Sequence, residues 1–332
     1  MPSRKIEKEI EALNTLRCAG PTADVLLALR KALNERANLV VAKAAQIAAG
    51  MNCRNLLPDL AKAFERLFEN PRKADPQCWG KDALAKSLKD LGYAESELFL
   101  RGMRHVQMEP VWGGEADTAV TLRGTCALAL MQCRDMPREA TLRVLLDALT
   151  DELSEKPERS APVRIDAIRA LEQMEGEEVI LLLRLKAKLG DVDPAVTGQA
   201  FESLLRLEGT RSVEFVLSFL ESEDEVREEA ALALGASRLG SAVQALMKAW
   251  TQSSPTQADP VILRAISSSR TEAAIDFLLE LVRTGCETHA IEALRALALH
   301  AGSPDIAMRV AEIVRARTEA AVQAEFHREF RQ

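Results

Sequence analysis

The chain has little of what builds β-sheets. Aromatic residues make up 4% of its 332 residues, with three tryptophans and a single tyrosine. Few runs of β-branched or aromatic residues alternate at period two, and such runs are the usual sign of strands. Leu and Ala dominate instead. The sequence therefore predicts an all-α fold in which strands are not expected.

Long hydrophobic runs are also missing. No apolar stretch approaches the roughly 18 to 20 residues that a membrane-spanning helix needs. The N-terminal segment is charged from Arg4 onward and lacks an apolar core, unlike a signal peptide. We expect a cytoplasmic chain with no membrane span.

Cysteines are few and scattered. The six cysteines form no CxxC pair, which favours reduced, buried thiols over disulfides. Cys126 and Cys133 come nearest to a metal-binding pair, but no histidine lies at ligand spacing from them. We expect no metal and no cofactor.

Positive charge is in deficit, with a formal net charge of −7 and a pI near 5.4. Proteins that bind nucleic acid neutralise phosphates with a basic surface, so nucleic acid is a disfavoured partner. Such a function would need a contiguous basic stripe, for which Arg101, Arg104 and Arg123 are the candidates.

The stretch 222–240, SEDEVREEAALALGASRLG, carries the pattern that organises the chain. Acidic residues precede Val226, which suits the N-terminus of a helix. Ala230, Ala231 and Leu234 follow at the three- and four-residue spacing of an amphipathic helix. The small side chains of the two alanines would let a neighbouring helix approach closely.

Degenerate copies of this pattern recur along the chain. Each pair of predicted helices has one anchor residue near the start of its second helix: Val40, Cys78 or Trp79, Leu122, Val163, Val196, Val226, Val261 and His289. The anchors lie about 36 residues apart on average, and a two-helix unit with that period indicates an α-solenoid. Because His289 stands where other pairs have an apolar residue, we expect it to be at least partly buried.

At Asp193-Pro194-x-Val196 and at Glu225-Val226-Arg227 the chain resembles the HEAT and HEAT-like repeat family, whose second helix is entered through a D-P-x-V-R motif. The resemblance covers roughly residues 22 to 300. It implies a single domain, a right-handed α-solenoid of about eight helical-hairpin repeats with end-capping helices. The expected parts are an N-terminal cap (1–20), irregular repeats (21–101), a loop insertion (102–116), regular repeats (117–302) and one long C-terminal capping helix (303–332). Within the regular part, a loop carrying Pro157 joins two helices.

Three enzyme groups with HEAT-like repeats match this sequence poorly. Deoxyhypusine hydroxylases hold iron through repeated His-Glu pairs, whereas none of the four histidines here is followed by Glu. Alkylpurine DNA glycosylases need a basic concave face with aromatics and a key Asp, for which Trp112 and Asp117 are the candidates. Phycobilin lyases share the repeat type, but no residue here singles out a tetrapyrrole site.

The repeat pattern lapses in one stretch, residues 99–117. Pro110 and Gly113-Gly114 forbid a continuous helix, so a loop must leave the stack, and loops on a rigid scaffold often carry function. The alternative is that its apolar residues, Val106 to Trp112, fold back over a gap between repeats. Catalysis by His105 and Glu109 would lack a nucleophile and an oxyanion hole. The candidate partner-binding residues are Arg101, Arg104, His105, Gln107, Glu109, Trp112, Asp117 and Arg123.

Arg123, Arg164 and Arg227 each follow an anchor residue directly. They would form either a basic ladder for an acidic partner or a set of ion pairs that hold neighbouring repeats in register. We favour the ion pairs, because the forked guanidinium suits such contacts.

The function favoured by the sequence is a non-enzymatic scaffold or adaptor. It would present a concave helical surface and the Trp-containing loop to a protein or peptide partner. The alternatives are a small-ligand-binding protein or lyase-type enzyme with its site at residues 99–117 and, less favoured, a nucleic-acid-binding protein. The oligomeric state is left open.

Overall fold

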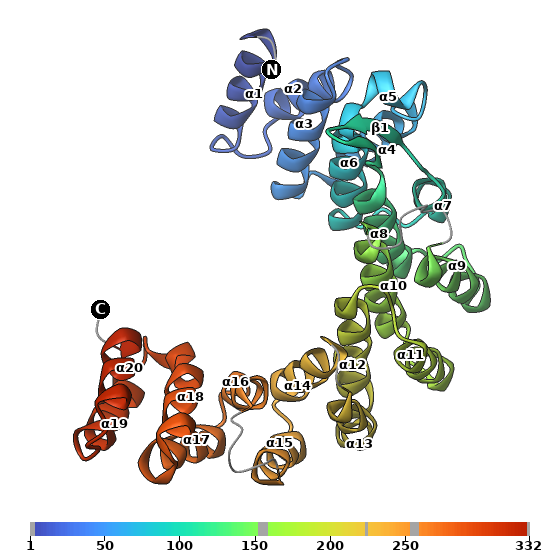
Figure 1. Cartoon of the computed structure of the whole chain (residues 1–332). Helices are drawn as coiled ribbons and strands as arrows, with labels where there is room; N and C mark the ends of the chain where they lie inside the picture. The colour runs from blue at the N-terminus through green and yellow to red at the C-terminus, as the bar shows by residue number, and fades with distance from the viewer. Residues whose placement is uncertain (1–3, 152–158, 223–224, 253–258, 331–332) are drawn as a thin grey trace. The chain divides into compact units, whose positions relative to one another are not determined.

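The computed structural model describes residues 4–151, 159–222, 225–252 and 259–330. These residues are helical apart from turns and one two-stranded hairpin, so the all-α prediction is confirmed (Figure 1). The chain divides into two compact units, Met1–Glu175 and Gly176–Gln332, which are described one at a time. Among the described residues, no helix is both long and apolar enough to cross a membrane.

The first unit is a row of helical pairs. Its elements are α1 (Arg4–Leu16), α2 (Ala23–Leu33), α3 (Asn38–Gly50), α4 (Leu57–Arg66), α5 (Pro71–Ala74), α6 (Trp79–Asp90), α7 (Ser96–Met103), β1 (Met108–Val111), β2 (Gly114–Asp117), α8 (Val120–Ala129), α9 (Arg138–Thr150) and α10 (Ala161–Met174). The second helix of each pair packs on the next, in the order α3, α6, α8, α10, and α2, α4, α7 and α9 lie against this inner row.

The second unit repeats the arrangement. It contains α11 (Glu177–Leu189), α12 (Pro194–Glu208), α13 (Val213–Leu217), α14 (Glu225–Ser237), α15 (Gly240–Gln252), α16 (Pro260–Ser268), α17 (Glu272–Thr284), α18 (Glu287–Leu297), α19 (Pro304–Arg315) and α20 (Ala320–Phe330). Here the inner row is α12, α14, α16, α18, α20.

The anchor residues lie on the sides of the inner helices that contact neighbouring helices. Val40, Leu122, Val163 and Val196 are at most 1% exposed, as expected for residues that meet two neighbouring helices. At the start of α6 the buried residue is Cys78, which directly precedes the helix, whereas Trp79 is 54% exposed. Val226, Val261 and His289 are partly buried, which confirms the expected burial of His289. Its ring meets the edge of Trp250 with centroids 5.1 Å apart.

Small residues set the spacing in the inner row. Ala230 and Ala231 of α14 are fully buried, as predicted, and α14 packs on both α12 and α16. A Cβ atom on Gly235 would overlap the carbonyl oxygen of Ala265 in α16. The two helices therefore approach closely enough to require glycine at this position.

Aspartate-proline pairs start two of the inner helices. The Asp193 carboxylate accepts a hydrogen bond from Ala195 N, 3.0 Å away, and the Asp259 carboxylate accepts from Val261 N and Ile262 N. A side-chain oxygen at this position satisfies backbone N–H groups that have no partner within the helix. Proline suits the first turn because its missing N–H would be unpaired there in any case.

Two expectations about secondary structure are wrong. The predicted loop insertion, residues 102–116, contains regular structure, because it includes most of the β1–β2 hairpin. The low β-propensity of the chain as a whole did not predict these strands. The tail is not one long helix but the pair α19 and α20, broken near Arg317, whose guanidinium bonds the carbonyl oxygens of Arg283 and Gly285. The pair packs on α17 and α18 as a further hairpin. The loop carrying Pro157, like Glu223 and Asp224 of the acidic run before Val226, lies outside the described residues.

Candidate functional site: a hairpin held by a buried polar network

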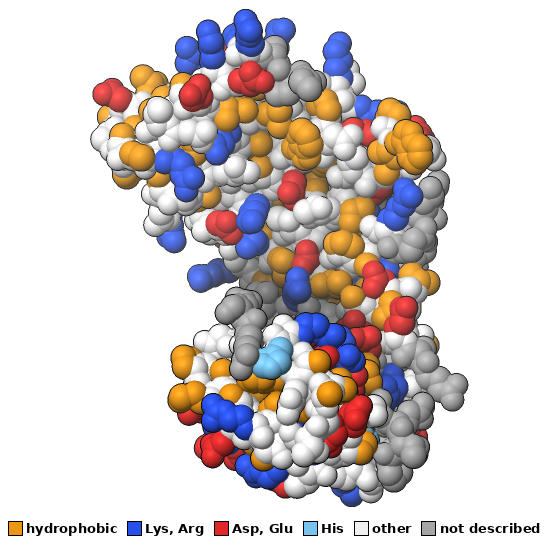
Figure 2. Space-filling view, turned by 60° about the vertical axis from the view of Figure 1, so that its left-hand side comes forward, with side chains coloured by type: hydrophobic (Ala, Val, Ile, Leu, Met, Phe, Trp, Pro, Cys, Tyr) orange, Lys and Arg blue, Asp and Glu red, His pale blue; other side chains and the backbone are white. Residues whose placement is uncertain are grey.

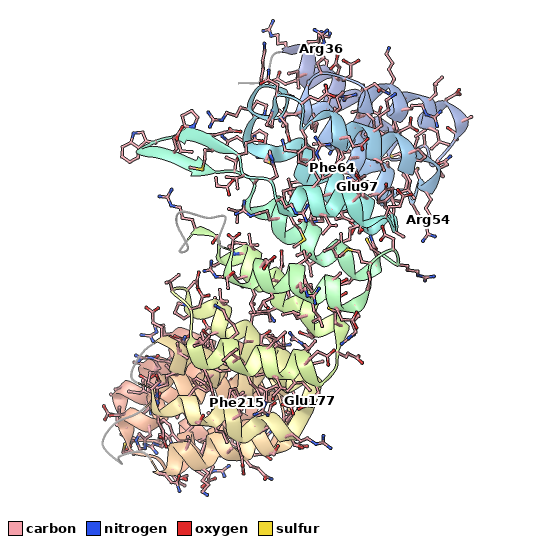
Figure 3. The ribbon with its side chains drawn as sticks, turned by 90° about the vertical axis from the view of Figure 1, so that its right-hand side faces the viewer. Arg36, Arg54, Phe64, Glu97, Glu177 and Phe215 are labelled. Atoms are coloured by element: carbon pink, nitrogen blue, oxygen red, sulfur yellow. The ribbon has the colours of Figure 1, made fainter. Side chains whose placement is uncertain are left out.

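The β1–β2 hairpin projects away from the helices of the first unit, whereas Phe64 lies among those helices (Figure 3). Its strands pair antiparallel, from Met108 opposite Asp117 to Val111 opposite Gly114, leaving Trp112 and Gly113 as the turn. Gly113 has φ +90°, a conformation in which a side chain would be strained. Trp112 is fully exposed, at 104% of its reference area.

Glu109 fixes β1 to the start of α6. Its carboxylate accepts hydrogen bonds from Gln77 N at 2.9 and 3.0 Å and from Gln77 Nε2 at 2.8 Å. Gln77 has φ +61° and Cys78 has φ +58°, both left-handed and costly for residues other than glycine. Because Glu109 is only 6% exposed, these donors compensate for its burial, and the contact holds the strained turn in place.

Gln107 extends the same network. Its Nε2 donates to the carbonyl oxygen of Asp75 at 2.8 Å and also to Glu109, while its Oε1 lies 3.0 Å from His105 Nε2. Its own carbonyl accepts from Thr118 N at 2.9 Å, which joins the two ends of the hairpin. Gln107 is 2% exposed, so its polar atoms are used inside the protein rather than offered to a ligand.

A fully buried ion pair lies beneath the hairpin. Lys81 Nζ is 3.0 Å from Asp75 Oδ2, and neither side chain is exposed. Asp75 also accepts from Gly80 N at 2.7 Å, Lys81 N at 2.9 Å and Asn38 Nδ2 at 2.8 Å. A buried ion pair needs such additional hydrogen bonds to offset desolvation. The pair therefore connects α3, the turn before α6, and α6 itself.

The C-terminal end of β2, at the base of the hairpin, is held by Arg123 of α8. Its NH1 lies 2.5 Å from Asp117 Oδ2 and its NH2 lies 3.2 Å from Asp151 Oδ2. Burial alone would raise the pKa of Asp117, but hydrogen bonds from Gln107 N, Arg123 and Ala119 N outweigh it and lower the pKa. Asp117 is therefore a stable anion that orients the guanidinium.

His105 lies between this network and Phe68. Burial lowers the pKa of His105, against the opposing effect of its hydrogen bond to Gln107, so the ring favours the neutral form. The rings of His105 and Phe68 meet edge to face with centroids 4.9 Å apart. The Arg101 guanidinium covers Phe68, 4.5 Å from its centroid. His105 therefore serves packing and hydrogen bonding in this arrangement.

The eight candidate residues divide into two groups. Arg101, Arg104 and Trp112 are exposed, whereas His105, Gln107, Glu109, Asp117 and Arg123 belong to the network that anchors the hairpin. Trp112 does not share a recess with His105 and Glu109, because it lies at the tip of the hairpin. The alternative in which Trp112 folds back over a gap between repeats does not hold for the same reason.

The basic stripe that the disfavoured nucleic-acid-binding function would need cannot run through Arg101, Arg104 and Arg123. Arg123 is 1% exposed and forms ion pairs with Asp117 and Asp151, so its guanidinium cannot reach a phosphate.

The three arginines that follow anchor residues make hydrogen bonds or ion pairs with other residues of the chain. Arg123 joins α8 to Asp151 at the end of α9, and Arg227 of α14 pairs with Asp259 at the start of α16. Arg164 is 2% exposed and donates to Ser160 Oγ at 2.7 Å. The contacts of Arg123 and Arg227 support the interpretation that these arginines keep neighbouring helical pairs in register.

Sequence reasoning missed Asp75, Gln77 and Lys81. A signal for Asp75 was present, because Asp75-Pro76 has the same Asp-Pro form as Asp193-Pro194. The role of Gln77 has no such signal, since it depends on a left-handed turn and on a carboxylate 32 positions later. Within the described part of the chain, no group of three or more His, Cys, Asp or Glu side chains is placed to hold a metal ion.

The comparisons with known proteins add little to this picture. No protein-family model matches the chain, and no curated protein matches its sequence. Among solved structures, human deoxyhypusine hydroxylase in complex with glycerol is similar at 20% identity, covering 83% of this chain and 92% of that protein, with a TM-score of 0.29. An engineered protein is similar at 17% identity, covering 91% and 93%, with a TM-score of 0.18. At such TM-scores neither likeness carries an argument about fold or activity.

Proposed function

We propose that this chain is a non-enzymatic scaffold or adaptor that binds a protein partner through the β1–β2 hairpin and its inner row of helices. The proposed architecture is a right-handed α-solenoid of HEAT-like helical hairpins. The packing of successive inner helices in each unit supports it, as do the aspartate-capped starts of α12 and α16. All six cysteines are free thiols, which suits the reduced, cytoplasmic setting that we propose.

The observation that carries the proposal is the contrast between the tip of the hairpin and its base. Trp112 is fully exposed, and Val111 beside it is 38% exposed. The base is held by hydrogen bonds that Glu109 accepts from Gln77 and that Gln107 donates to the carbonyl oxygen of Asp75. Tryptophan, with Tyr and Arg, is enriched among the residues that contribute most of the binding energy at protein interfaces. A hairpin whose base is already fixed also loses less conformational freedom on binding.

A small-ligand site or lyase-type activity at residues 99–117 has less support. The Glu109 carboxylate takes up donors from Gln77 and Gln107, and the pKa of the nearby Cys78 thiol is raised to about 12, chiefly by burial. Neither group is then poised for general acid–base or nucleophilic chemistry. We therefore propose no reaction for this region.

The test is site-specific photo-crosslinking in the native host. A photoreactive amino acid is placed at position 112 and, as a control, at position 308, where Met308 is 66% exposed on α19. We expect one recurring protein crosslinked from position 112 and absent from position 308. In a pull-down, Trp112→Ala should lose that protein, while Met308→Ala should retain it. Recovery of the same proteins from both positions would contradict the proposal.

A further inference from the structure

The two edges of the β1–β2 hairpin differ in the backbone groups that they present. At its base, Thr118 N donates to the carbonyl oxygen of Gln107 at 2.9 Å, so residues 107 and 118 meet at a hydrogen-bonding position of the ladder. In an antiparallel ladder, hydrogen-bonded pairs alternate with pairs that exchange no hydrogen bonds. Pro110 lies opposite Glu115, three positions further along, and the two form a pair of the second kind. Their backbone groups therefore point outward, one from each edge.

Proline closes the outer edge of β1. Pro110 is exposed, but it has no N–H, so this edge lacks a donor where an added strand would need one. Proline on an edge strand is one of the means by which proteins avoid pairing with other chains. The edge of β1 is therefore not suited to accept a further strand.

The outer edge of β2 is open. Glu115 is exposed, and within the described part of the chain its backbone N–H and C=O have no hydrogen-bond partner. A Cβ atom on Gly114, the preceding residue, would meet no atom within 4 Å. Figure 3 shows the hairpin standing clear of the helices of the first unit. Unpaired backbone groups on an exposed edge are a template for another strand.

The charge of Glu115 selects among the strands that could pair with β2. Asp117 of the same strand is paired with Arg123, whereas Glu115 forms no ion pair with any described residue. Across two strands, opposite charges attract and like charges directly opposite are unfavourable. Symmetric pairing with β2 of a second copy would place two Glu115 side chains opposite each other. The edge therefore fits a strand of another protein that places Lys or Arg opposite Glu115.

The charged surface elsewhere gives less direction to a partner. Figure 2 shows acidic and basic side chains interspersed over much of the face in view. Such a mixture does not strongly attract a partner of one charge, so recognition depends on local features. The hairpin combines two of them, the open edge of β2 and the fully exposed Trp112 in the adjacent turn.

From this geometry we propose that the hairpin binds its partner by strand addition. An extended segment of the partner lies along β2, donates to the carbonyl oxygen of Glu115 and accepts from its N–H. A Lys or Arg of the segment meets the Glu115 carboxylate, and an apolar side chain packs on Trp112. In this mode of recognition the backbone supplies affinity and the side chains supply specificity. The inference rests on the proposed protein-binding function and adds the conformation and charge of the bound segment.

The test begins with random peptides displayed to the full chain. We expect the selected peptides to carry a basic residue within a proline-free run of β-branched or aromatic residues. A synthetic peptide of that consensus is then titrated by fluorescence anisotropy. N-methylation of its backbone should weaken binding by at least about tenfold at the residue opposite Glu115. The residues on either side should tolerate it, because only alternate backbone groups face β2.

Three changes at position 115 separate the backbone from the side chain. Glu115→Pro removes the outward N–H, which the hairpin itself does not use, and should abolish binding of the peptide. Glu115→Ala keeps this N–H and should weaken binding by no more than about fivefold. Glu115→Lys should prefer a peptide in which the basic residue is changed to Glu. Thermal unfolding checks that each variant is folded.

A measurement on the parent chain is independent of any change in fold. Hydrogen exchange at the Glu115 amide, resolved by mass spectrometry, should slow by at least about tenfold when the peptide is bound. Exchange in α1, which lies outside the hairpin, should stay unchanged.

Four outcomes would overturn the inference. They are selection of no peptide or only of acidic ones, equal binding by the parent and a folded Glu115→Pro variant, unchanged exchange at Glu115, and self-association of the chain that Glu115→Pro abolishes. Crosslinking from position 112 tests the proposed function separately. A partner that is captured there and still binds Glu115→Pro would leave that function standing and remove only strand addition.

Discussion

Glu109 is the residue on which the hairpin depends most directly. Its carboxylate accepts from Gln77 N, Gln77 Nε2 and the buried Gln107 Nε2, and its removal would leave these donors without their acceptor. We expect Glu109→Ala to lower the free energy of unfolding by about 2 to 4 kcal/mol, measured by urea denaturation. Glu115→Ala, at an exposed position of β2, should stay within about 0.5 kcal/mol. Equal effects of the two changes would show that the network does not anchor the hairpin.

A second residue-scale prediction concerns Glu229 of α14. Burial raises its pKa above the ordinary 4.5, and Glu202, Glu228 and Asp193 raise it further. Because the folded pKa is raised, the ionised form destabilises the fold above that pKa. The penalty disappears as the pH falls through it. Glu229→Gln should therefore be more stable than the parent at about pH 7, by less than about 0.5 kcal/mol after solvent screening.

The advantage of Glu229→Gln should shrink as the pH falls toward 4.5, which urea denaturation at several pH values would measure. Glu225→Gln, at an exposed position of the same helix, should show a smaller change. An advantage that stays constant over this pH range would contradict the assignment.

At the scale of elements, the spacing of α14 and α16 depends on Gly235. A Cβ atom there would overlap the Ala265 carbonyl oxygen, and a backbone atom cannot move aside as a side chain can. We expect Gly235→Ala to cost about 1 to 3 kcal/mol through overpacking. Gly240→Ala is the matched control, because a Cβ atom there meets no atom within 4 Å. A destabilising effect of the control alone would show that the packing of these helices is misassigned.

The hairpin is an element whose tip and base should respond differently. Trp112 is fully exposed, so Trp112→Ala should change the free energy of unfolding by no more than about 0.5 kcal/mol. The same variant should lose the protein captured by crosslinking from position 112. A large loss of stability would mean that the indole packs within the fold and is not available to a partner.

At the scale of the whole molecule, each unit has its own core and each inner helix packs on its neighbours. In such an array a local defect loosens the adjacent repeats first. In Gly235→Ala, hydrogen exchange should therefore accelerate in α12, α14 and α16 before it does in α3 and α6. Uniform acceleration along the chain would instead indicate one cooperative unit of folding.

Much of the helical layout could be predicted from local sequence. Helix α14, Glu225–Ser237, lies within the stretch 222–240 whose pattern predicted an amphipathic helix. Such segments combine an amphipathic pattern with a clear start and stop, both of which act over a few residues. The tail was misjudged because the break between α19 and α20 is stabilised by Arg317, through contacts with a turn more than 30 positions earlier.

What the sequence determined by itself was the class of fold and the residues that face the core, because helix periodicity and small-residue spacing are local properties. Only the tertiary structure decided which candidate residues are available to a partner. Gln107, Glu109 and Arg123 resemble binding residues in the sequence, yet contacts with Asp75, Gln77 and Asp151 bury them. Trp112 remains exposed because the strands that carry it pair with each other away from the helices. Burial of a polar side chain depends on partners far along the chain, and these are brought together only by folding.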